Sequence, residues 1–449
     1  MMKKILIANR AAAAARILRA VREMGLKSVV VYSEADRDLP YVAQADESIC
    51  IGPAPARDSY LNQALLLDVM ARCRADAVHP GYGFLSENAG FARQVQAAGH
   101  CFIGPSPKWI EALGNKAAAR TLMQAHGLAM GGSTGVLPRD DVTAVTRAAR
   151  ELGYPVLIKP AGGGGGIGMV PVENEQSLPA SWERASGIAE KAFGDSALYM
   201  ERFVREPRHI EFQFLADRHG EVISLFERDC STQRRYQKVI EEAPAAAIDP
   251  QVVEEMAEQL RQVLIKIGYD VIGTVEMLYT PESGFSFLEV NTRLQVEHAV
   301  TEAITGVDIV QAQISLAAGE RLSNVLTQTP KRNGHAIEAR IYAEDPVRCL
   351  PSPGLLRVFQ LPQSSIGLRI ETGYAEGNRV SSHYDPMVAK LITNANSRDD
   401  AILSMINALE ATQVEGIKTN IPTILKALRS DRFQAGTMAV DGLQALIAA

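Results

Sequence analysis

Residues 273–291 read GTVEMLYTPESGFSFLEVN, in which two apolar and β-branched stretches flank the turn sequence PESG at 281–284. A four-residue turn of this composition predicts an antiparallel hairpin. In the simplest register Thr280 faces Phe285, and every other pair in the hairpin follows from that one. This stretch decides the fold because it predicts an antiparallel sheet in the second half of the chain.

The same register sets two acidic residues across from each other, with Glu276 opposite Glu289 and Thr274 opposite Asn291. Cross-strand side chains lie about 5 Å apart. Two carboxylates at that distance repel by about 3 kcal/mol at an effective dielectric of about 20. A divalent ion would relieve this repulsion, and oxygen ligands from Glu276, Glu289 and Asn291 suit Mg²⁺ better than zinc. The alternative is a solvated sheet face, where the repulsion is only about 1 kcal/mol.

Further strands are expected on either side of the hairpin. Residues 209–214, HIEFQF, alternate in polarity, so that Ile210, Phe212 and Phe214 share one face of a strand. The tail from Arg398 onward has mostly helical patterning. The second half therefore predicts an antiparallel sheet followed by helices.

The N-terminal part of the chain has a different pattern. Apolar runs near residues 4–8, 28–32, 76–79 and 100–103 alternate with helical stretches, which predicts a parallel sheet covered by helices. Such sheets bind ligands beyond the carboxyl ends of their strands. Tyr82 and Gly83 follow one of these ends, and the alternative for them is an ordinary strand-to-helix loop.

The expected fold class is α/β combined with α+β, with an N-terminal parallel-sheet domain and a C-terminal antiparallel-sheet domain. The expected segments are an N-terminal domain at 1–103, a helical linker at 104–130, a glycine-rich lid at 131–203 and a C-terminal part at 204–449.

Composition excludes several classes of protein. The 449 residues carry a net charge of −6, which argues against a basic nucleic-acid binder. No uncharged apolar run reaches the about 18 residues of a membrane helix, so a cytoplasmic protein is expected. The 5 cysteines include no C-x-x-C pair, which argues against a disulfide framework and a structural zinc site.

Five glycines at 162–166 follow Lys159 closely. A loop without side chains can bring backbone amides close to phosphate oxygens, although this one lacks the Lys-Ser/Thr ending of a Walker A loop. A flexible linker is the alternative. Lys159 favours the phosphate site because it supplies a cation beside the loop.

A dense group of polar residues follows Asn291. Together with two more distant cations it could bind a small anion, and its members are Arg293, Gln295, Glu297, His298, Lys238 and Arg340. The segment 233–238, QRRYQK, is by itself more typical of a solvated face.

Several motifs in order now make the chain resemble biotin carboxylase, the ATP-grasp subunit or domain of biotin-dependent carboxylases such as acetyl-CoA carboxylase. The resemblance covers essentially the whole length. The motifs are HPGYGFLSEN at 79–88, the loop after Lys159, ERDCS at 227–231, EVNTRLQVEH at 289–298 and EARI at 338–341.

The resemblance implies a fold with a pre-ATP-grasp domain and an ATP-grasp lid, and an ATP-dependent ligase. ATP would phosphorylate bicarbonate to carboxyphosphate, and the CO₂ released from it would be captured by a ring nitrogen of biotin. ATP with Mg²⁺ or Mn²⁺ is the implied cofactor, and biotin on a carrier protein is a substrate.

The resemblance also implies roles for individual residues. Nucleotide contacts would come from Lys116, Lys159, Gly164, Gly165, Gly166, Glu201, Arg202, Val204, His209, Gln233, Tyr236 and Lys238, with Glu276 and Glu289 on magnesium. Bicarbonate would be held by Lys238, Arg293, Gln295 and Val296, with Glu297 as the base. Arg340 would stabilise the biotin enolate, with Tyr82 and Gly83 near the ring.

Three positions depart from the family pattern. The family usually has Asn-Arg-Gly-Glu-Ile-Ala where this chain continues from Asn9-Arg10 into the alanines 11–15. A basic residue commonly stands where this chain has Ile167, and histidine is frequent at the position of Tyr236.

The implied partners are a separate biotin carboxyl carrier protein, a carboxyltransferase subunit and a second copy of the chain in a homodimer. No Met-Lys-Met segment supplies a biotin-accepting lysine here. The final acceptor could be acetyl-CoA, another acyl-CoA or a 2-oxo acid. Two alternatives remain: another ATP-grasp ligase that joins a carboxylate to an amine, and a nucleotide-binding subunit without activity.

Overall fold

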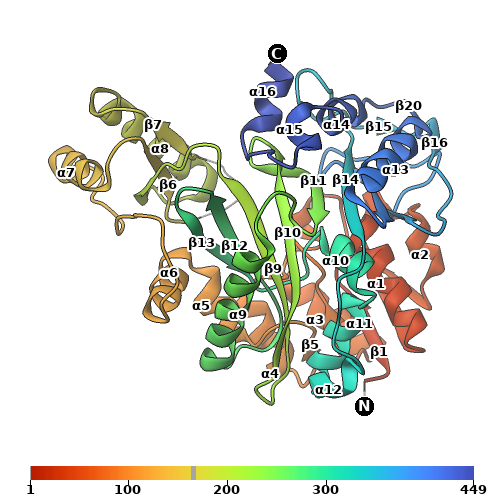
Figure 1. Cartoon of the computed structure of the whole chain (residues 1–449). Coiled ribbons are helices and arrows are strands. Elements are labelled where there is room, and N and C mark those ends of the chain that lie inside the picture. The colour runs from red at the N-terminus through yellow and green to blue at the C-terminus, as the bar shows by residue number, and fades with distance from the viewer. Residues whose placement is uncertain (1, 163–167, 449) are drawn as a thin grey trace.

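The computed structural model describes residues 2–162 and 168–448 of the chain. Figure 1 shows an N-terminal α/β layer, a small sheet with two helices that projects from the body, and a large sheet that leads into the C-terminal helices. None of the helices in these described ranges combines the length and apolar composition that a membrane-spanning helix requires.

The N-terminal layer is the predicted parallel sheet, with strand order β3-β2-β1-β4-β5. Its strands are β1 (Lys4–Ile7), β2 (Lys27–Tyr32), β3 (Glu47–Cys50), β4 (Ala77–His79) and β5 (Cys101–Phe102), and its helices are α1 (Ala11–Glu23), α2 (Pro40–Gln44), α3 (Gln63–Cys73) and α4 (Ala89–Ala97). The apolar pattern did not predict β3. This strand lies at the edge of the sheet and is largely exposed, so it has no continuous apolar run.

Two helices, α5 (Pro107–Gly114) and α6 (Lys116–Ala125), lead to the projecting part. That part contains α7 (Val142–Leu152), β6 (Val156–Pro160), β7 (Val170–Val172), α8 (Leu178–Phe193) and β8 (Leu198–Arg202). Its antiparallel sheet has the order β7-β6-β8 and shares a core of its own with α7 and α8, in which Trp182 and Met200 are buried.

The predicted antiparallel sheet has eight strands in the order β13-β12-β9-β10-β11-β14-β19-β17. The strands are β9 (Arg208–Ala216), β10 (Val222–Arg234), β11 (Gln237–Ala243), β12 (Val271–Thr280), β13 (Gly284–Asn291), β14 (His335–Tyr342), β17 (Leu368–Thr372) and β19 (Met387–Ala395). Helices α9 (Pro250–Ile267), α10 (His298–Thr305), α11 (Ile309–Ala317) and α12 (Leu322–Val325) pack around it.

The alternation of β9 is confirmed. Ile210, Phe212 and Phe214 are 0% exposed and pack in one core cluster with Leu260 and Leu264 of α9. The intervening residues of β9 therefore point to the opposite face.

The C-terminal part is mostly helical, as predicted. It contains α13 (Arg398–Glu410), α14 (Ile421–Leu428), α15 (Asp431–Gln434) and α16 (Gly442–Ala448). Two small ribbons complete it, β15 (Gly354–Leu355) with β18 (Arg379–Val380) and β16 (Val358–Gln360) with β20 (Gln413–Glu415).

The hairpin of β12 and β13 corrects one detail of the sequence prediction. Thr280 pairs with Gly284 rather than with Phe285, because the turn is one residue shorter than expected. A bulge at Leu288 then shifts the register by one residue, so Glu276 still pairs with Glu289 and Thr274 with Asn291. The pairing of the two carboxylates is confirmed, although the register from which it was inferred was wrong at the turn.

Candidate active site

A cavity of about 790 Å³ extends between the projecting part and the large sheet. Residues from distant segments line it, and most of them were named from the sequence: Lys116, Lys159, Glu201, Arg202, Val204, His209, Gln233, Tyr236, Lys238, Glu276, Glu289, Asn291, Arg293, Gln295, Val296, Glu297 and Arg340. Gly164, Gly165 and Gly166, together with Ile167, lie outside the described residues.

Lys238 is the centre of the charged groups in this cavity. Its Nζ lies 2.6 Å from Glu211, 2.9 Å from Glu276 and 2.6 Å from Glu297. Burial would lower the pKa of Lys238, but the three carboxylates outweigh burial and raise it well above its ordinary value. Lys238 is therefore a fixed cation in a site of low dielectric.

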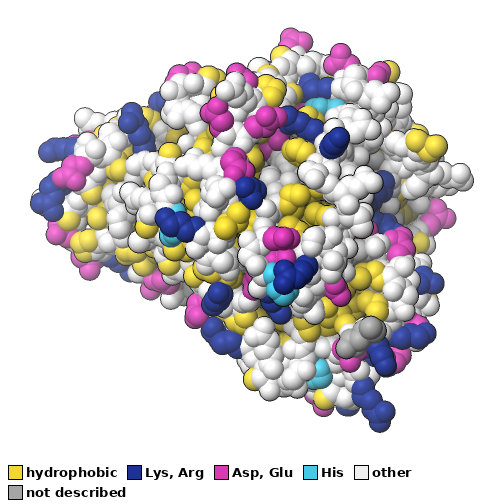
Figure 2. All heavy atoms as spheres, turned by 60° about the horizontal axis from the view of Figure 1, so that its bottom comes forward, with side chains coloured by type: hydrophobic (Ala, Val, Ile, Leu, Met, Phe, Trp, Pro, Cys, Tyr) yellow, Lys and Arg dark blue, Asp and Glu magenta, His cyan; other side chains and the backbone are white. Residues whose placement is uncertain are grey.

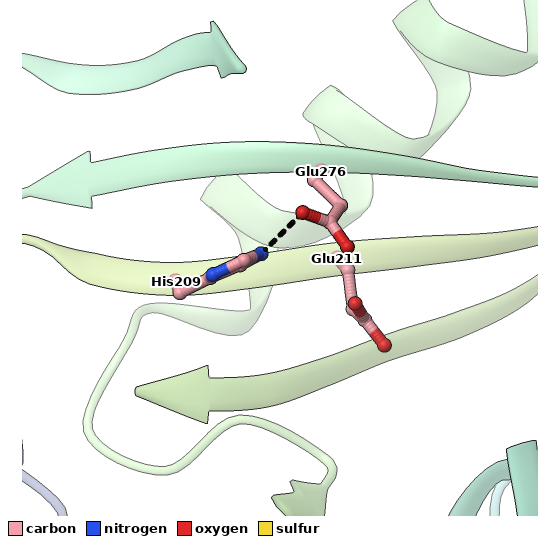
Figure 3. Close-up of side chains that lie close together, drawn as sticks. All are labelled: His209, Glu211 and Glu276. Atoms are coloured by element: carbon pink, nitrogen blue, oxygen red, sulfur yellow. Dashed lines mark ion pairs between the residues drawn. The ribbon is translucent and has the colours of Figure 1, made fainter. Parts of the chain in front are cut away.

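Glu276 is held on both of its oxygens. His209 Nε2 lies 2.9 Å from Oε2 (Figure 3), while Lys238 Nζ and the Asn291 amide nitrogen lie 2.9 and 2.8 Å from Oε1. The amide nitrogen of Gln233 lies 2.8 Å from His209 Nδ1 and so fixes the other edge of the ring. Burial would raise the pKa of Glu276, but Lys238 and His209 lower it well below its ordinary value, and the group is ionised at neutral pH.

Glu289, the cross-strand partner of Glu276, faces a different cation. Its Oε2 lies 3.1 Å from Lys116 Nζ, at the first residue of α6. Within the described residues, metal-ligating atoms gather most closely at His209, Glu211 and Glu276, and again at Glu211, Cys230 and Glu297. Glu211 was not predicted to take part in the site.

Glu211 is already neutralised by two cations. Its Oε1 accepts from Arg228 Nε at 2.5 Å, and its Oε2 contacts Lys238 at 2.6 Å. Arg228 is 0% exposed. Glu211 does not line the cavity, whereas Glu276 and Glu289 are both on its wall, so these two carboxylates are the ones open to a divalent ion.

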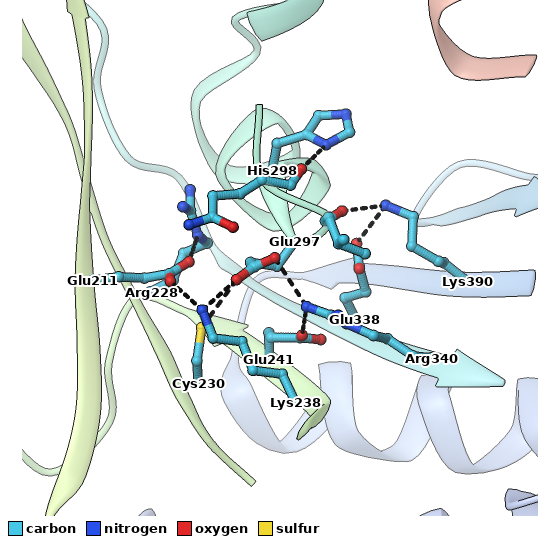
Figure 4. A network of polar contacts seen from close by, with 12 residues as sticks. Glu211, Arg228, Cys230, Lys238, Glu241, Glu297, His298, Glu338, Arg340 and Lys390 are labelled. Carbon is cyan, nitrogen blue, oxygen red and sulfur yellow. Dashed lines mark hydrogen bonds and ion pairs between the residues drawn. The ribbon is translucent and has the colours of Figure 1, made fainter. Parts of the chain in front are cut away.

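Glu297 and Arg340 meet beside Lys238 (Figure 4). Glu297 precedes α10 and accepts from Arg340 of β14 at 2.9 Å. Burial would raise the pKa of Glu297, but Lys238, Arg340 and Arg228 lower it well below its ordinary value. Glu297 is thus an ionised carboxylate on the wall of the cavity, without a proton at neutral pH.

Lys159 of β6 contacts Glu201 of β8 at 2.5 Å, and Arg120 of α6 lies 3.2 Å from the same carboxylate. Burial would raise the pKa of Glu201, but Lys159 and Arg120 lower it below its ordinary value. The predicted cation before the glycine loop therefore lines the cavity already paired with a carboxylate.

A second cavity of about 490 Å³ lies on the other side of Arg340. Tyr82 and Gly83 line it, as does the start of α1. Arg340, Arg293, Val296 and Asp385 line both cavities. The two spaces thus meet at Arg340.

The segment 233–238 corrects a second expectation. It forms the turn from β10 into β11, with positive φ at Arg235 and Tyr236. Gln233 and Arg234 are 3% and 8% exposed, so the prediction of a solvated face was wrong for them. Tyr236 is 42% exposed and does fit that prediction.

The alanines 11–15 form the first turn of α1. Ala11 has φ +48°, a left-handed conformation that glycine adopts without strain. Gly373 approaches its backbone so closely that a Cβ on Gly373 would lie 2.2 Å from the carbonyl carbon of Ala11. Ala11 and Ala12 line the second cavity with small side chains.

Sequence reasoning missed several members of the site. Leu278 lines the cavity two residues after Glu276, and Glu211 lies two residues after His209, so the period of a strand could have found both. Leu288 is the bulge residue and Asp385 precedes β19, and no local pattern indicated either. On the face drawn in Figure 2, basic and acidic side chains are interspersed rather than gathered by sign.

Comparison with known proteins agrees with this geometry. Residues 1–110 match the model "Biotin carboxylase, N-terminal domain", 115–325 match "Carbamoyl-phosphate synthase L chain, ATP binding domain", and 338–445 match "Biotin carboxylase C-terminal domain". The biotin carboxylase of Halalkalibacterium halodurans is 48% identical over 97% of this chain and 96% of its own. The chain belongs to the biotin carboxylase family.

Other biotin carboxylases are similarly close. That of Allochromatium vinosum is 48% identical over 100% of this chain and 99% of its own. The structure of the biotin carboxylase from Campylobacter jejuni in a β-γ-ATP complex superposes with a TM-score of 0.95 at 41% identity, covering 99% of each chain.

The biotin carboxylase domain of a 2-oxoglutarate carboxylase is also similar in structure. The biotin carboxylase domain dimer of the Hydrogenobacter thermophilus 2-oxoglutarate carboxylase, in complex with MgADP, ADP and bicarbonate, gives a TM-score of 0.94 at 40% identity over 100% of this chain and 99% of that one. The fold class and the family expected from the sequence are thereby confirmed.

Proposed function

We propose that this protein is an ATP-dependent ligase that carboxylates biotin with bicarbonate. The observation that carries the proposal is the junction of two cavities at Arg340, beside the ionised carboxylate of Glu297 and the cation of Lys238. One cavity would bind ATP and bicarbonate, and the other would admit biotin. A reaction that passes a carboxyl group from one substrate to another needs such a shared wall.

The larger cavity has the chemistry of a nucleotide site. Lys116 and Lys159 would contact phosphates, and His209, Gln233 and Tyr236 would contact phosphate or ribose. Glu201, Arg202 and Val204 would frame the adenine, next to the apolar side chains of Leu278 and Leu288 in the same cavity. Gly164, Gly165 and Gly166 would cover the phosphates as part of a lid that excludes water.

Glu276 and Glu289 fit a magnesium ion because they offer carboxylate oxygens on one cavity wall. Asn291 lies beside them as the third expected ligand, with its amide nitrogen on Glu276 and its oxygen on Arg293. In the described structure Lys238 pairs with Glu276, and Lys116 pairs with Glu289. Magnesium, or manganese, would neutralise charge on the nucleotide phosphates. The residues themselves would orient those phosphates toward bicarbonate.

Bicarbonate would be held by Lys238, Arg293, Gln295 and the Val296 amide. Glu297 would accept its proton, and a bicarbonate oxygen would attack the γ-phosphorus of ATP with ADP as the leaving group. The product is carboxyphosphate, which breaks down to CO₂ and phosphate. Lys238 and Arg293 would hold these short-lived anions in place.

Biotin would enter the second cavity past Tyr82 and Gly83. The phosphate released from carboxyphosphate would take the ring N–H proton, which places negative charge on the ureido oxygen, and the Arg340 guanidinium would stabilise that charge. The nitrogen then attacks CO₂ to give carboxybiotin. Arg340 acts on charge that is absent from the ground state, so it would lower the barrier rather than merely bind substrate.

The wider setting is part of the proposal. Biotin would arrive on a separate carrier protein, a carboxyltransferase subunit would use the carboxybiotin, and the chain would work in the cytoplasm as a homodimer. Its acceptor would be acetyl-CoA, in fatty acid biosynthesis, with a 2-oxo acid or another acyl-CoA as alternatives. Segment 1–103 would serve as the biotin-side domain and segment 104–130 as the linker. Segment 131–203 would serve as the lid, and segment 204–449 would contain the catalytic sheet.

Hydrolysis of ATP in bicarbonate buffer, with and without free biotin, tests the proposal. We expect slow bicarbonate-dependent hydrolysis that free biotin accelerates, with carboxybiotin trapped from labelled bicarbonate. An ATP-grasp ligase for another pair of substrates would show no response to biotin. A subunit without activity would bind ATP, as measured by calorimetry, but hydrolyse none.

A further inference from the structure

A second row of buried acidic side chains lies behind Arg340. Glu241 on β11 pairs in register with Glu338 on β14, and both are 0% exposed. The same terminal nitrogen of Arg340 that contacts Glu297 also contacts Glu241 (Figure 4). The reaction proposed above uses Glu297 and gives Glu241 no part.

Stability does not account for a carboxylate at this position. Glu241 Oε1 forms an ion pair with Arg340, but among the described residues neither oxygen has a partner in hydrogen-bond geometry, and burying such a group costs free energy. The next residue on the strand is different: Glu242 accepts from Arg398 at 2.7 and 3.0 Å and lies 2.7 Å from His335 Nε2. Glu241 is therefore a buried acid whose contact of opposite charge is Arg340.

The two carboxylates that contact Arg340 differ in whether they change their charge during turnover. Glu297 borders the larger cavity, and once it accepts a proton from bicarbonate it no longer attracts the guanidinium as an anion. Glu241 lines neither cavity and keeps its place. The Nε of Arg340 is buried without a partner, so the terminal nitrogen is the point at which the guanidinium is held.

We infer that Glu241 is a positioning residue, which holds the Arg340 guanidinium at the junction of the two cavities while Glu297 is protonated. The inference rests on the proposed function, because it concerns the biotin half of that reaction. Glu241 touches no substrate in this account and acts through Arg340 alone.

Charged and titratable groups surround Glu241 on every element packed against it. They are Arg340, Glu338 and Tyr342 on β14, Glu297 before α10, Cys230 on β10 and Lys238 on its own strand. Burial raises the pKa of Glu241 to about 7, with Arg340 opposing the rise. Below about pH 7 Glu241 is neutral and Arg340 is held by Glu297 alone, whereas above it both carboxylates hold the guanidinium.

The first experiment compares Glu241→Gln with Glu242→Gln in the full chain. Each substitution removes one buried carboxylate of similar size from the same strand, but Glu242 pairs with His335 and Arg398 rather than with Arg340. For E241Q we expect kcat with free biotin to fall by about 10- to 100-fold. The rate at which E241Q hydrolyses ATP without biotin, and its KM for ATP, should stay within about twofold of the values for the unmodified protein. E242Q should change neither kcat with biotin nor the hydrolysis of ATP without it. Thermal melting of both variants measures how much stability each one loses with its buried carboxylate.

The second experiment is the pH profile of kcat with biotin. The unmodified protein should show a rise with a midpoint near the raised pKa of Glu241, about 7, and E241Q should lack that step. An unmodified protein without the step would overturn the inference, and this readout remains even if E241Q fails to fold.

The outcomes separate the two proposals. Equal losses in the biotin-dependent and biotin-independent reactions of E241Q, or no loss at all, would remove Glu241 as a positioning residue for Arg340. If biotin does not stimulate the unmodified protein, the proposed function itself fails, and the role of Glu241 fails with it.

Discussion

Lys238 and Lys390 both lie among buried carboxylates, but they differ in their access to a cavity. Lys238 lies between Glu211, Glu276 and Glu297, and Lys390 of β19 lies 3.3 Å from Glu338 and 3.0 Å from Glu371. The side chain of Lys238 is 13% exposed and borders a cavity of about 790 Å³, whereas that of Lys390 is 1% exposed.

This difference shows that a cluster of charges is not by itself a site. Lys390 also donates to the Val296 carbonyl at 2.5 Å, so it ties β19 to the segment that lines both cavities. The Lys390 cluster supports the scaffold, and the Lys238 cluster presents charge to ligands. What distinguishes them is access to open space.

The largest expected effect is a loss of stability at the Lys390 cluster. Lys390→Met leaves Glu338 and Glu371 buried without their shared cation, and breaking a buried ion pair costs about 3 to 5 kcal/mol. Urea unfolding followed by circular dichroism measures the free energy of unfolding. Lys238→Met is the matched variant, for which we expect about half that loss because two of its carboxylates, Glu276 and Glu297, line the larger cavity, whereas Glu338 and Glu371 line neither cavity. Equal losses would contradict the distinction between the two clusters.

The next effect concerns catalysis at the Lys238 cluster. Arg340→Ala should lower biotin carboxylation by about 10² to 10³, or about 2.7 to 4 kcal/mol, because it removes the donor aimed at the developing charge. Steady-state kinetics with free biotin gives the rate, and calorimetry should find ATP binding retained. Arg398→Ala, which removes a guanidinium from Glu242 instead, is the control. Unchanged turnover in the Arg340 variant would exclude it from the mechanism.

Acid should destabilise the folded protein through His298, which is 1% exposed and whose Nδ1 donates to the Gln295 carbonyl at 2.8 Å. Burial lowers its pKa from 6.5 to about 3, although Glu302 opposes the shift. Between these values the unfolded chain binds a proton that the folded protein does not, so stability falls as pH falls, by about 1.4 kcal/mol per pH unit.

His298→Gln should reduce that pH dependence by the same amount. Unfolding free energies measured at about pH 6 and about pH 5 give the slope. His219→Gln, on an exposed turn, is the control and should leave the slope as it is. A His298 variant with the original slope would show that the ring is protonated in the folded protein.

The smallest effect is expected at the rim of the open cavity. Tyr236 is 42% exposed, and surface substitutions change free energies by about 0.5 kcal/mol or less. Tyr236→Ala should therefore change the KM for ATP by about twofold at most, as initial rates at varied ATP will show. A tenfold change would mean that this residue closes onto the nucleotide.

Much of the site was predictable because strands repeat every two residues. The shared face of Ile210, Phe212 and Phe214 follows from that period, and the structure has it. The structure also pairs Glu276 with Glu289, but it does so through a shorter turn and a bulge that the period did not predict. The same period could have indicated Glu211.

Other features had no local signal. The edge strand β3 lacks an apolar run, and the bulge at Leu288 depends on how β12 and β13 meet rather than on either strand alone. Gln233 and Arg234 looked like surface residues because their burial is produced by elements distant in the sequence, such as Glu344, which pairs with Arg234.

The sequence by itself determined most strand and helix patterns, the family, and many of the residues that line the larger cavity, because local periodicity and motif spacing are properties of a few neighbouring residues. Only the tertiary structure decided that Arg340 from β14 meets Glu297 before α10 at the junction of two cavities, with Glu241 behind it. Contacts of this kind depend on the order and register of strands far apart in the chain, and no short stretch of sequence specifies them.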